Sequence, residues 1–129
     1  MVRAPLIFLP LIGCAAVPVP PAVLTGDWGG THVGLHLTPS GGTLEYDCAH
    51  GTIGPIVVDG SGRFTAEGTH TAEHGGPVRE GEVLPSSPVR YSGSIAGDRM
   101  ILEGRLDNGV ELGSFELRRG AEPRILRCL

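Results

Sequence analysis

Short runs of alternating apolar and polar residues, separated by turn-forming residues, recur along most of this chain. The alternation is plain in five runs: HVGLHL at 32–37, TLEYDC at 43–48, RFTAEGT at 63–69, VRYSGSI at 89–95 and RMILEGRL at 99–106. A period of two is typical of strands with one buried face, and no segment shows a convincing helical period. The pattern therefore predicts an all-β protein.

Three less regular runs complete the predicted strands. IGPIVVD at 53–59 contains Pro55, which favours an edge or bulged strand. In VELGSFELRR at 110–119 the apolar positions change parity, and a bulge near Gly113 would reconcile them. DNG at 107–109 predicts a hairpin turn, and RILRCL at 124–129 is the last strand. Eight strands joined by short turns favour a small antiparallel up-and-down barrel, with a two-sheet β-sandwich as the alternative.

The first strand leaves two interpretations of the barrel interior. Trp28, His32 and His36 share one parity, and Leu35 and its aliphatic neighbours share the other. Without a bulge, an inward Trp28 brings both histidines inward, and they become possible ligand-binding residues in a small polar cavity. With a bulge at the two glycines 29–30, the aliphatic side chains fill the core and the histidines face water. The glycine pair favours the bulge and the filled core.

Composition and charge narrow the classes of function. The chain has 129 residues, enough for one domain, and its 21 glycines and 11 prolines fall mainly between the alternating runs. The formal net charge is −4, whereas a nucleic-acid-binding domain would carry a basic stripe. We therefore expect an ordered monomer that does not bind nucleic acid.

The N-terminal residues resemble an export signal. Arg3 precedes an apolar segment at 5–12 that is too short to span a bilayer, which is typical of a secretory signal. LIGC at 11–14 resembles the lipobox of bacterial lipoproteins, which implies that Cys14 is lipidated and anchors the protein in a membrane. Ala15 after the cysteine implies the outer membrane, facing the periplasm. Cleavage after Ala16, giving a soluble periplasmic protein, is the alternative.

The export signal and the lipidation site divide the chain into three predicted parts. Residues 1–13 are the lipoprotein signal peptide, 14–24 are the lipidated cysteine with a Pro-rich tether, and 25–129 form the barrel domain. With Cys14 lipidated, Cys48 and Cys128 remain as a pair, and an oxidising compartment permits a disulfide between them. Two free buried thiols are the alternative.

A second resemblance lies in LTGDWGG at 24–30. Gly26-Asp27-Trp28 is similar to the Gly-x-Trp that opens the first strand of lipocalins and related calycin barrels, including avidin-like barrels. The resemblance implies that Trp28 closes one barrel end and that an arginine from a late strand packs across its ring. Arg119 is the candidate for that arginine, with Arg118 second.

The residues that could carry chemistry do not form a recognised constellation. His32 and His36 lie roughly 13 Å apart if both belong to one strand, too far to share a metal ion. No Gly-x-Ser-x-Gly sequence is present, and Asp47 beside His50 is better explained as a hydrogen bond in a loop. We therefore expect this protein to have no catalytic residues, to bind no metal ion and to carry no cofactor.

The connection at 75–88 is long for a compact domain. Its charged residues Arg79, Glu80 and Glu82 and its apolar Leu84 make it a candidate loop for contact with a protein partner. YDC at 46–48 resembles a feature of small lipoproteins that inhibit lysozymes, and the opening Trp is shared with periplasmic metalloprotease inhibitors. The sequence therefore favours a non-catalytic protein-interaction or inhibitor-like module. A lipocalin-like carrier of a small ligand is the alternative.

Overall fold

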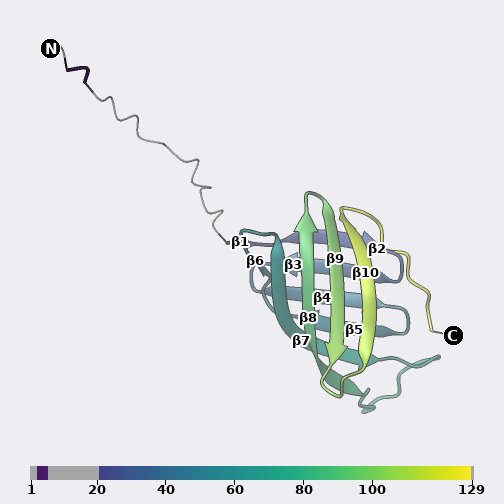
Figure 1. Cartoon of the computed structure of the whole chain (residues 1–129). Coiled ribbons are helices and arrows are strands. Elements are labelled where there is room, and N and C mark those ends of the chain that lie inside the picture. Colours follow the sequence, from purple (N-terminus) through teal and green to yellow (C-terminus); the bar gives the residue numbers. More distant parts are fainter. Residues whose placement is uncertain (1–2, 6–20, 129) are drawn as a thin grey trace.

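The computed structural model describes residues 3–5 and 21–128 and shows a closed antiparallel β-barrel (Figure 1). Each barrel strand pairs with the next one in the sequence, and the last pairs with the first. The predicted eight-stranded up-and-down barrel is therefore confirmed, and the β-sandwich alternative is wrong. In spatial order the strands are β10 (Glu111–Arg119), β2 (Gly26–Gly30), β3 (Val33–Thr38), β4 (Gly41–Tyr46), β5 (Ala49–Ile53), β7 (Arg63–Ala72), β8 (Ser86–Ala96) and β9 (Arg99–Leu106).

Two of the eight predicted strands are not members of the barrel. In the run 53–59 the residues Val57–Val58 form β6, which pairs outside the barrel with β1 (Ala22–Val23). The run 124–128 forms no strand among the described residues, although Arg124 makes a single bridge to Thr31. No helix in the described part of the chain is long and apolar enough to cross a membrane.

Two tight turns supply the missing barrel strands. The chain reverses at Thr31-His32, which makes β2 a strand of its own, and again at Asp47-Cys48, which starts β5. His32 and Cys48 take φ values of 71° and 53°, a region that non-glycine residues rarely adopt. Sequence patterns for two-residue hairpins rely on Asn-Gly or Asp-Gly, so these turns give no such signal.

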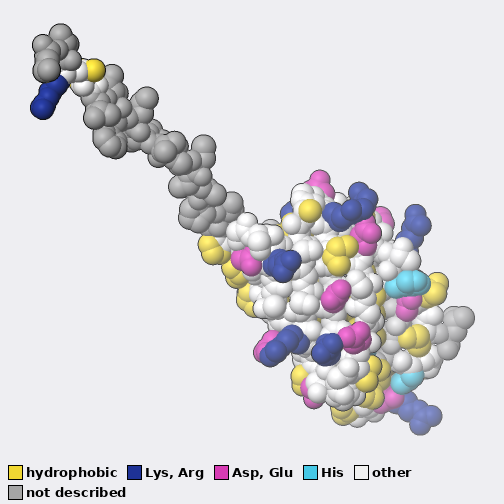
Figure 2. Space-filling view, in the orientation of Figure 1, with side chains coloured by type: hydrophobic (Ala, Val, Ile, Leu, Met, Phe, Trp, Pro, Cys, Tyr) yellow, Lys and Arg dark blue, Asp and Glu magenta, His cyan; other side chains and the backbone are white. Residues whose placement is uncertain are grey.

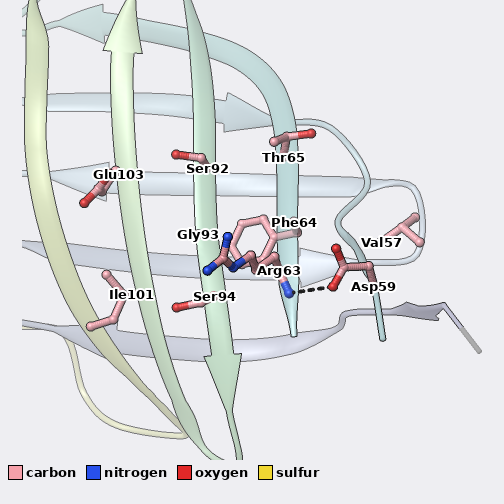
Figure 3. Close-up of a pocket in the computed structure, with 10 residues that line it drawn as sticks. All are labelled: Val57, Asp59, Arg63, Phe64, Thr65, Ser92, Gly93, Ser94, Ile101 and Glu103. Atoms are coloured by element: carbon pink, nitrogen blue, oxygen red, sulfur yellow. Dashed lines mark hydrogen bonds between the residues drawn. The ribbon is translucent and has the colours of Figure 1, made fainter. Parts of the chain in front are cut away.

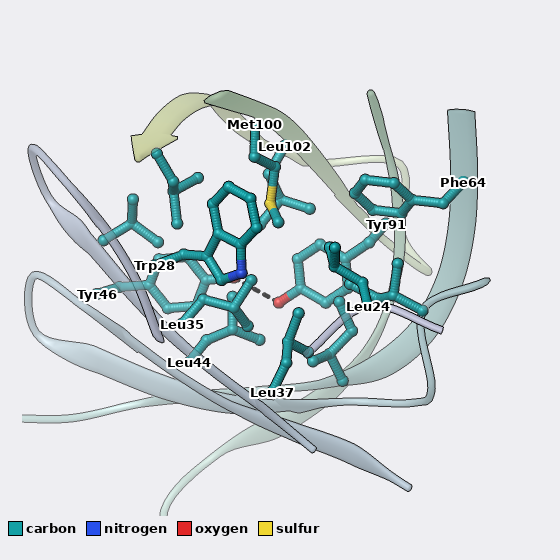
Figure 4. Close-up of a cluster of buried hydrophobic side chains, with 14 of the residues drawn as sticks. Leu24, Trp28, Leu35, Leu37, Leu44, Tyr46, Phe64, Tyr91, Met100 and Leu102 are labelled. Carbon is teal, nitrogen blue, oxygen red and sulfur yellow. Dashed lines mark hydrogen bonds between the residues drawn. The ribbon is translucent and has the colours of Figure 1, made fainter. Parts of the chain in front are cut away.

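The barrel interior is filled with side chains (Figure 4). Trp28 pairs across β2 and β3 with Leu35, and both side chains point inward, as predicted for a filled core. The predicted bulge at 29–30 is wrong, because the hairpin at 31–32 produces the change of parity. The predicted bulge near Gly113 is confirmed by a register shift between Glu111 and Gly113. The core consists of Leu24, Trp28, Val33, Leu35, Leu37, Leu44, Tyr46, Ala49, Ile53, Ile56, Phe64, Val89, Tyr91, Met100, Leu102 and Leu117.

The segment after β10, residues 120–128, runs as a strap along the outer wall of β2 and β3 (Figure 1). Glycines in the wall let it pack closely. A Cβ atom on Gly29 would lie 2.1 Å from the carbonyl oxygen of Ala121, and one on Gly34 would lie 2.9 Å from Cγ of Pro123. The strap therefore requires a wall without side chains at these two positions.

Leu24, at the end of the predicted tether, packs against the barrel. Its side chain is buried, and its backbone N–H donates to the carbonyl oxygen of Ile56. Ile56 is itself fully buried beside it. Residues 22–24 thus pack with the connection between β5 and β7.

Candidate functional site

One end of the barrel is closed in the way that the calycin resemblance implies. The guanidinium of Arg119 lies 4.4 Å from the centre of the Trp28 ring, and it donates to the carbonyl oxygen of Thr25 at 3.1 Å. Gly26 has a φ of 106°, and a Cβ there would approach the Arg119 guanidinium to 3.2 Å. We call this end, where Leu24 is also buried, the cap end.

The other end, which we call the loop end, carries the turns at 31–32, 47–48 and 107–110 and the connection at 73–85 between β7 and β8. Cys48 and Cys128 meet here with their sulfur atoms at bonding distance and their Cα atoms 4.8 Å apart. This pair joins the end of the strap to the β4–β5 turn. Cys14, the predicted lipidation site, lies outside the described residues.

Histidine–carboxylate pairs surround this disulfide. His32 pairs with Asp47, linking the β2–β3 turn to the β4–β5 turn. The Nδ1 atom of His50 donates to Glu73 at 2.6 Å, linking β5 to the start of the long connection. The predicted loop hydrogen bond between Asp47 and His50 is therefore wrong, because Asp47 pairs with His32 and His50 with Glu73.

The two histidines proposed as ligand-binding residues lie outside the barrel. His32 occupies the β2–β3 turn and His36 the outer face of β3, where it pairs with Asp27, and their side chains are 53% and 61% exposed. The structure does not bring these two histidines into a common site. The described residues contain no group of three or more His, Cys, Asp or Glu side chains that could hold a metal ion.

A third histidine, His70, faces inward and is half-buried. Its ring lies 5.4 Å from that of Tyr46, which in turn lies 5.5 Å from Phe115. Burial, and to a smaller degree the charge of His50, lowers the pKa of His70. The alternation that places Phe64 inward reaches position 70 when it is continued by three steps of two, so the signal was in the sequence.

The long connection contains a turn that is held by its own side chains. The N–H of Glu82 donates to the carbonyl oxygen of Arg79 at 3.0 Å, and Gly81 has a φ of 78°. The carboxylate of Glu82 accepts from the Arg79 N–H at 2.8 Å and from Nε2 of His74 at 2.6 Å. We call residues 79–82 the clamped turn.

His74 completes the clamp from both sides of its ring. Nδ1 lies 2.9 Å from the carbonyl oxygen of Gly75, while Nε2 faces Glu82. Both partners are acceptors, so both ring nitrogens donate only when the imidazole is protonated. The bond to Gly75 and the Glu82 carboxylate raise the pKa of His74, and the Arg79 N–H and His74 lower the pKa of Glu82.

Four of the six exposed large apolar side chains of the described residues lie at the loop end, and the other two, Val23 and Val57, lie on β1 and β6 at the cap end. Val83 beside the clamped turn is 90% exposed, Val78 on its other side is 55% exposed, and Leu84 is half-buried. Val110 and Leu126 add exposed apolar surface on the β9–β10 turn and the strap. Figure 1 shows that this end lies away from β1, where the N-terminal part of the chain reaches the barrel.

The barrel wall has a different character. On the face formed by β8, β9 and β10, basic and acidic side chains alternate (Figure 2), and many pair across strands, such as Arg105 with Glu111 at 2.7 Å. An open groove of about 770 Å³ lies on the outer wall over β7, β8 and β9, and its lining includes Ser92, Gly93 and Ser94 (Figure 3). The groove is a surface feature, separate from the barrel interior.

Comparison of the chain with protein-family models, with curated proteins and with solved structures found no match.

Proposed function

We propose that this protein is a non-catalytic, inhibitor-like interaction module of the bacterial cell envelope that meets a protein partner through its loop end. The observation that carries the proposal is the placement of exposed apolar surface. Because the core is filled with side chains, binding would use the outside of the barrel. There the exposed valines of the loop end stand apart from a wall of paired charges.

The cellular address supports the same function. LIGC at 11–14 favours lipidation of Cys14 and an outer-membrane anchor, and the Cys48–Cys128 pair suits an oxidising compartment. Since the chain reaches the barrel away from the loop end, an anchored domain would present that end to the periplasm. Replacing Cys14 with Ala is expected to release the protein from the membrane fraction. Retention there would contradict the anchor and favour another mode of attachment.

The same features favour a place among calycin-type barrels, on the evidence of the Trp28–Arg119 contact and the strand order. In that group a hollow barrel serves as a carrier, which was the alternative function. Here Trp28, Leu44, Tyr91 and Met100 occupy the interior. Native mass spectrometry of the exported domain would detect a retained ligand as a discrete adduct, and such an adduct would favour the carrier.

Site-specific photocrosslinking in exporting cells tests the interaction directly. A photoreactive amino acid would replace Glu80 in the clamped turn or Asn108 in the β9–β10 turn, both at the loop end. Ser92, on the barrel wall, provides the matched exposed control position. We expect a protein adduct of one discrete mass from the loop-end positions and none from Ser92. Adducts at none of the three positions, or equally at all three, would contradict the proposal.

A further inference from the structure

The clamped turn narrows the kind of partner that the loop end fits. Loops that order only on binding lose affinity to the entropy of ordering, whereas preformed loops avoid that cost. Here one backbone hydrogen bond and one bond from the Arg79 N–H to the Glu82 carboxylate close the turn. His74 holds the other oxygen of that carboxylate. The turn is therefore already ordered while its outer side chains remain free for contact.

The side chains on the turn point to the chemistry of the partner. Val83 is the most exposed of the large apolar side chains on the described surface, and Val78 flanks the turn on its other side. Arg79 uses its backbone N–H, and not its guanidinium, in the clamp. Arginine is enriched and glutamate is depleted at protein interfaces. Covering the 90% exposed side chain of Val83 would remove apolar surface from water, so Arg79 and Val83 are better anchors than Glu80.

We propose that the clamped turn is a preformed recognition element for a protein cleft that offers a carboxylate to Arg79 beside an apolar pocket for Val83. This inference rests on the proposed function and specifies its partner. Glu82 acts as a positioning residue: its carboxylate is bonded within the turn, and it thereby sets the direction in which Arg79 and Val83 project. Loss of Glu82 should weaken binding by freeing the turn, while loss of Arg79 or Val83 should remove a contact.

The clamp can be tested without the partner. In the full chain carrying Cys14→Ala, amide hydrogen exchange measured by NMR reports the Arg79 N–H directly. We expect Glu82→Ala to speed exchange of this amide by about fivefold or more, since a charge-assisted hydrogen bond is lost. Glu80→Ala, a matched loss of a carboxylate within the same turn, should leave the exchange rate unchanged. Equal exchange in wild type and Glu82→Ala would overturn the role assigned to Glu82.

The contact chemistry is tested with the photoreactive residue at position 80. Adduct yield should fall by about fivefold with Arg79→Gln or Val83→Ser, the effect expected of an interface anchor. Val57→Ser, on β6 at the cap end and 47% exposed, is the matched control and should leave the yield unchanged. A yield that survives both Arg79→Gln and Val83→Ser overturns this inference.

The crosslinking outcomes at positions 80 and 108 distinguish a failure of this inference from a failure of the proposed function. An adduct from position 108 without one from position 80 supports a loop-end interaction module but rejects the clamped turn as its recognition element. Adducts from neither position reject both. An adduct from position 80 whose partner shows a basic contact surface also rejects the acidic cleft.

Discussion

The hydroxyl groups of Tyr46 and Tyr91 share a hydrogen bond of 2.5 Å inside the barrel (Figure 4). Tyr91 is fully buried and Tyr46 nearly so, and burial raises the pKa of both hydroxyls. Each hydroxyl thus depends on the other within the described core. We predict that removing one of them destabilises the protein more than removing both.

The magnitude follows from the difference between an unpaired and an absent polar group. Tyr46→Phe leaves the Tyr91 hydroxyl buried without its partner, which costs about 1–3 kcal/mol of the free energy of unfolding. Tyr91→Phe should cost a similar amount or slightly less, because the hydroxyl that it leaves unpaired belongs to Tyr46, which lies nearer the loop end and is slightly more exposed. The double variant removes both polar groups and keeps the ring volume, so it should lie within about 1 kcal/mol of wild type.

Urea unfolding followed by the fluorescence of Trp28, the single tryptophan, provides the assay. A double-mutant cycle from the four proteins gives the coupling energy between the hydroxyls, which we expect to be at least about 1 kcal/mol. Additive losses, with the double variant the least stable of the four, would refute the reasoning. They would mean that each hydroxyl has another partner or reaches water.

Three further predictions concern the two barrel ends. Cys48→Ser removes the bond to Cys128 that closes 80 residues of chain, and should lower the free energy of unfolding by about 4 kcal/mol in urea, whereas a loss below about 1 kcal/mol would show that the strap alone constrains the chain. Arg119→Gln should cost about 1 kcal/mol and shift the emission of Trp28, and unchanged emission would contradict the contact between them. By NMR, the pKa of His74 should lie above the usual histidine value of about 6.5. Protonated His74 then stabilises the loop fully below about pH 6.5, and this contribution is lost as pH rises through the raised pKa. A pKa below about 6.5 would contradict the clamp.

Alternation along the chain was sufficient to predict the architecture but not the identity of every strand. Runs with clear alternation, such as 99–106, became strands at the predicted positions because tertiary packing used the same apolar face. GDWGG at 26–30 has too few apolar residues for a period to be visible, and it forms a strand through pairing with both neighbours. RILRCL at 124–129 alternates poorly, and its described residues form no strand, since no barrel edge remains open once the barrel has closed.

Predictions for individual residues succeeded where one strong contact determines the position. Trp28 and Arg119 meet because the pairing of β2 with β10 places them directly opposite each other. The histidines were harder to place, because their roles depend on carboxylates that are distant in sequence. His50 finds Glu73, 23 residues away, and no local pattern of residues encodes that pair.

The departures from local rules are concentrated at the loop end. Both non-glycine residues of the described chain with positive φ, His32 and Cys48, occupy its tight turns. Each is tied to the strap, His32 through its N–H to the carbonyl oxygen of Arg124 and Cys48 through Cys128. Backbone conformations of this kind cost of order 1 kcal/mol or more and persist where surrounding bonds enforce them. At the cap end no described non-glycine residue has a positive φ. A barrel that had only to be stable could use Asn-Gly turns at both ends, so the enforced geometry of the loop end is the strongest structural reason to look for function there.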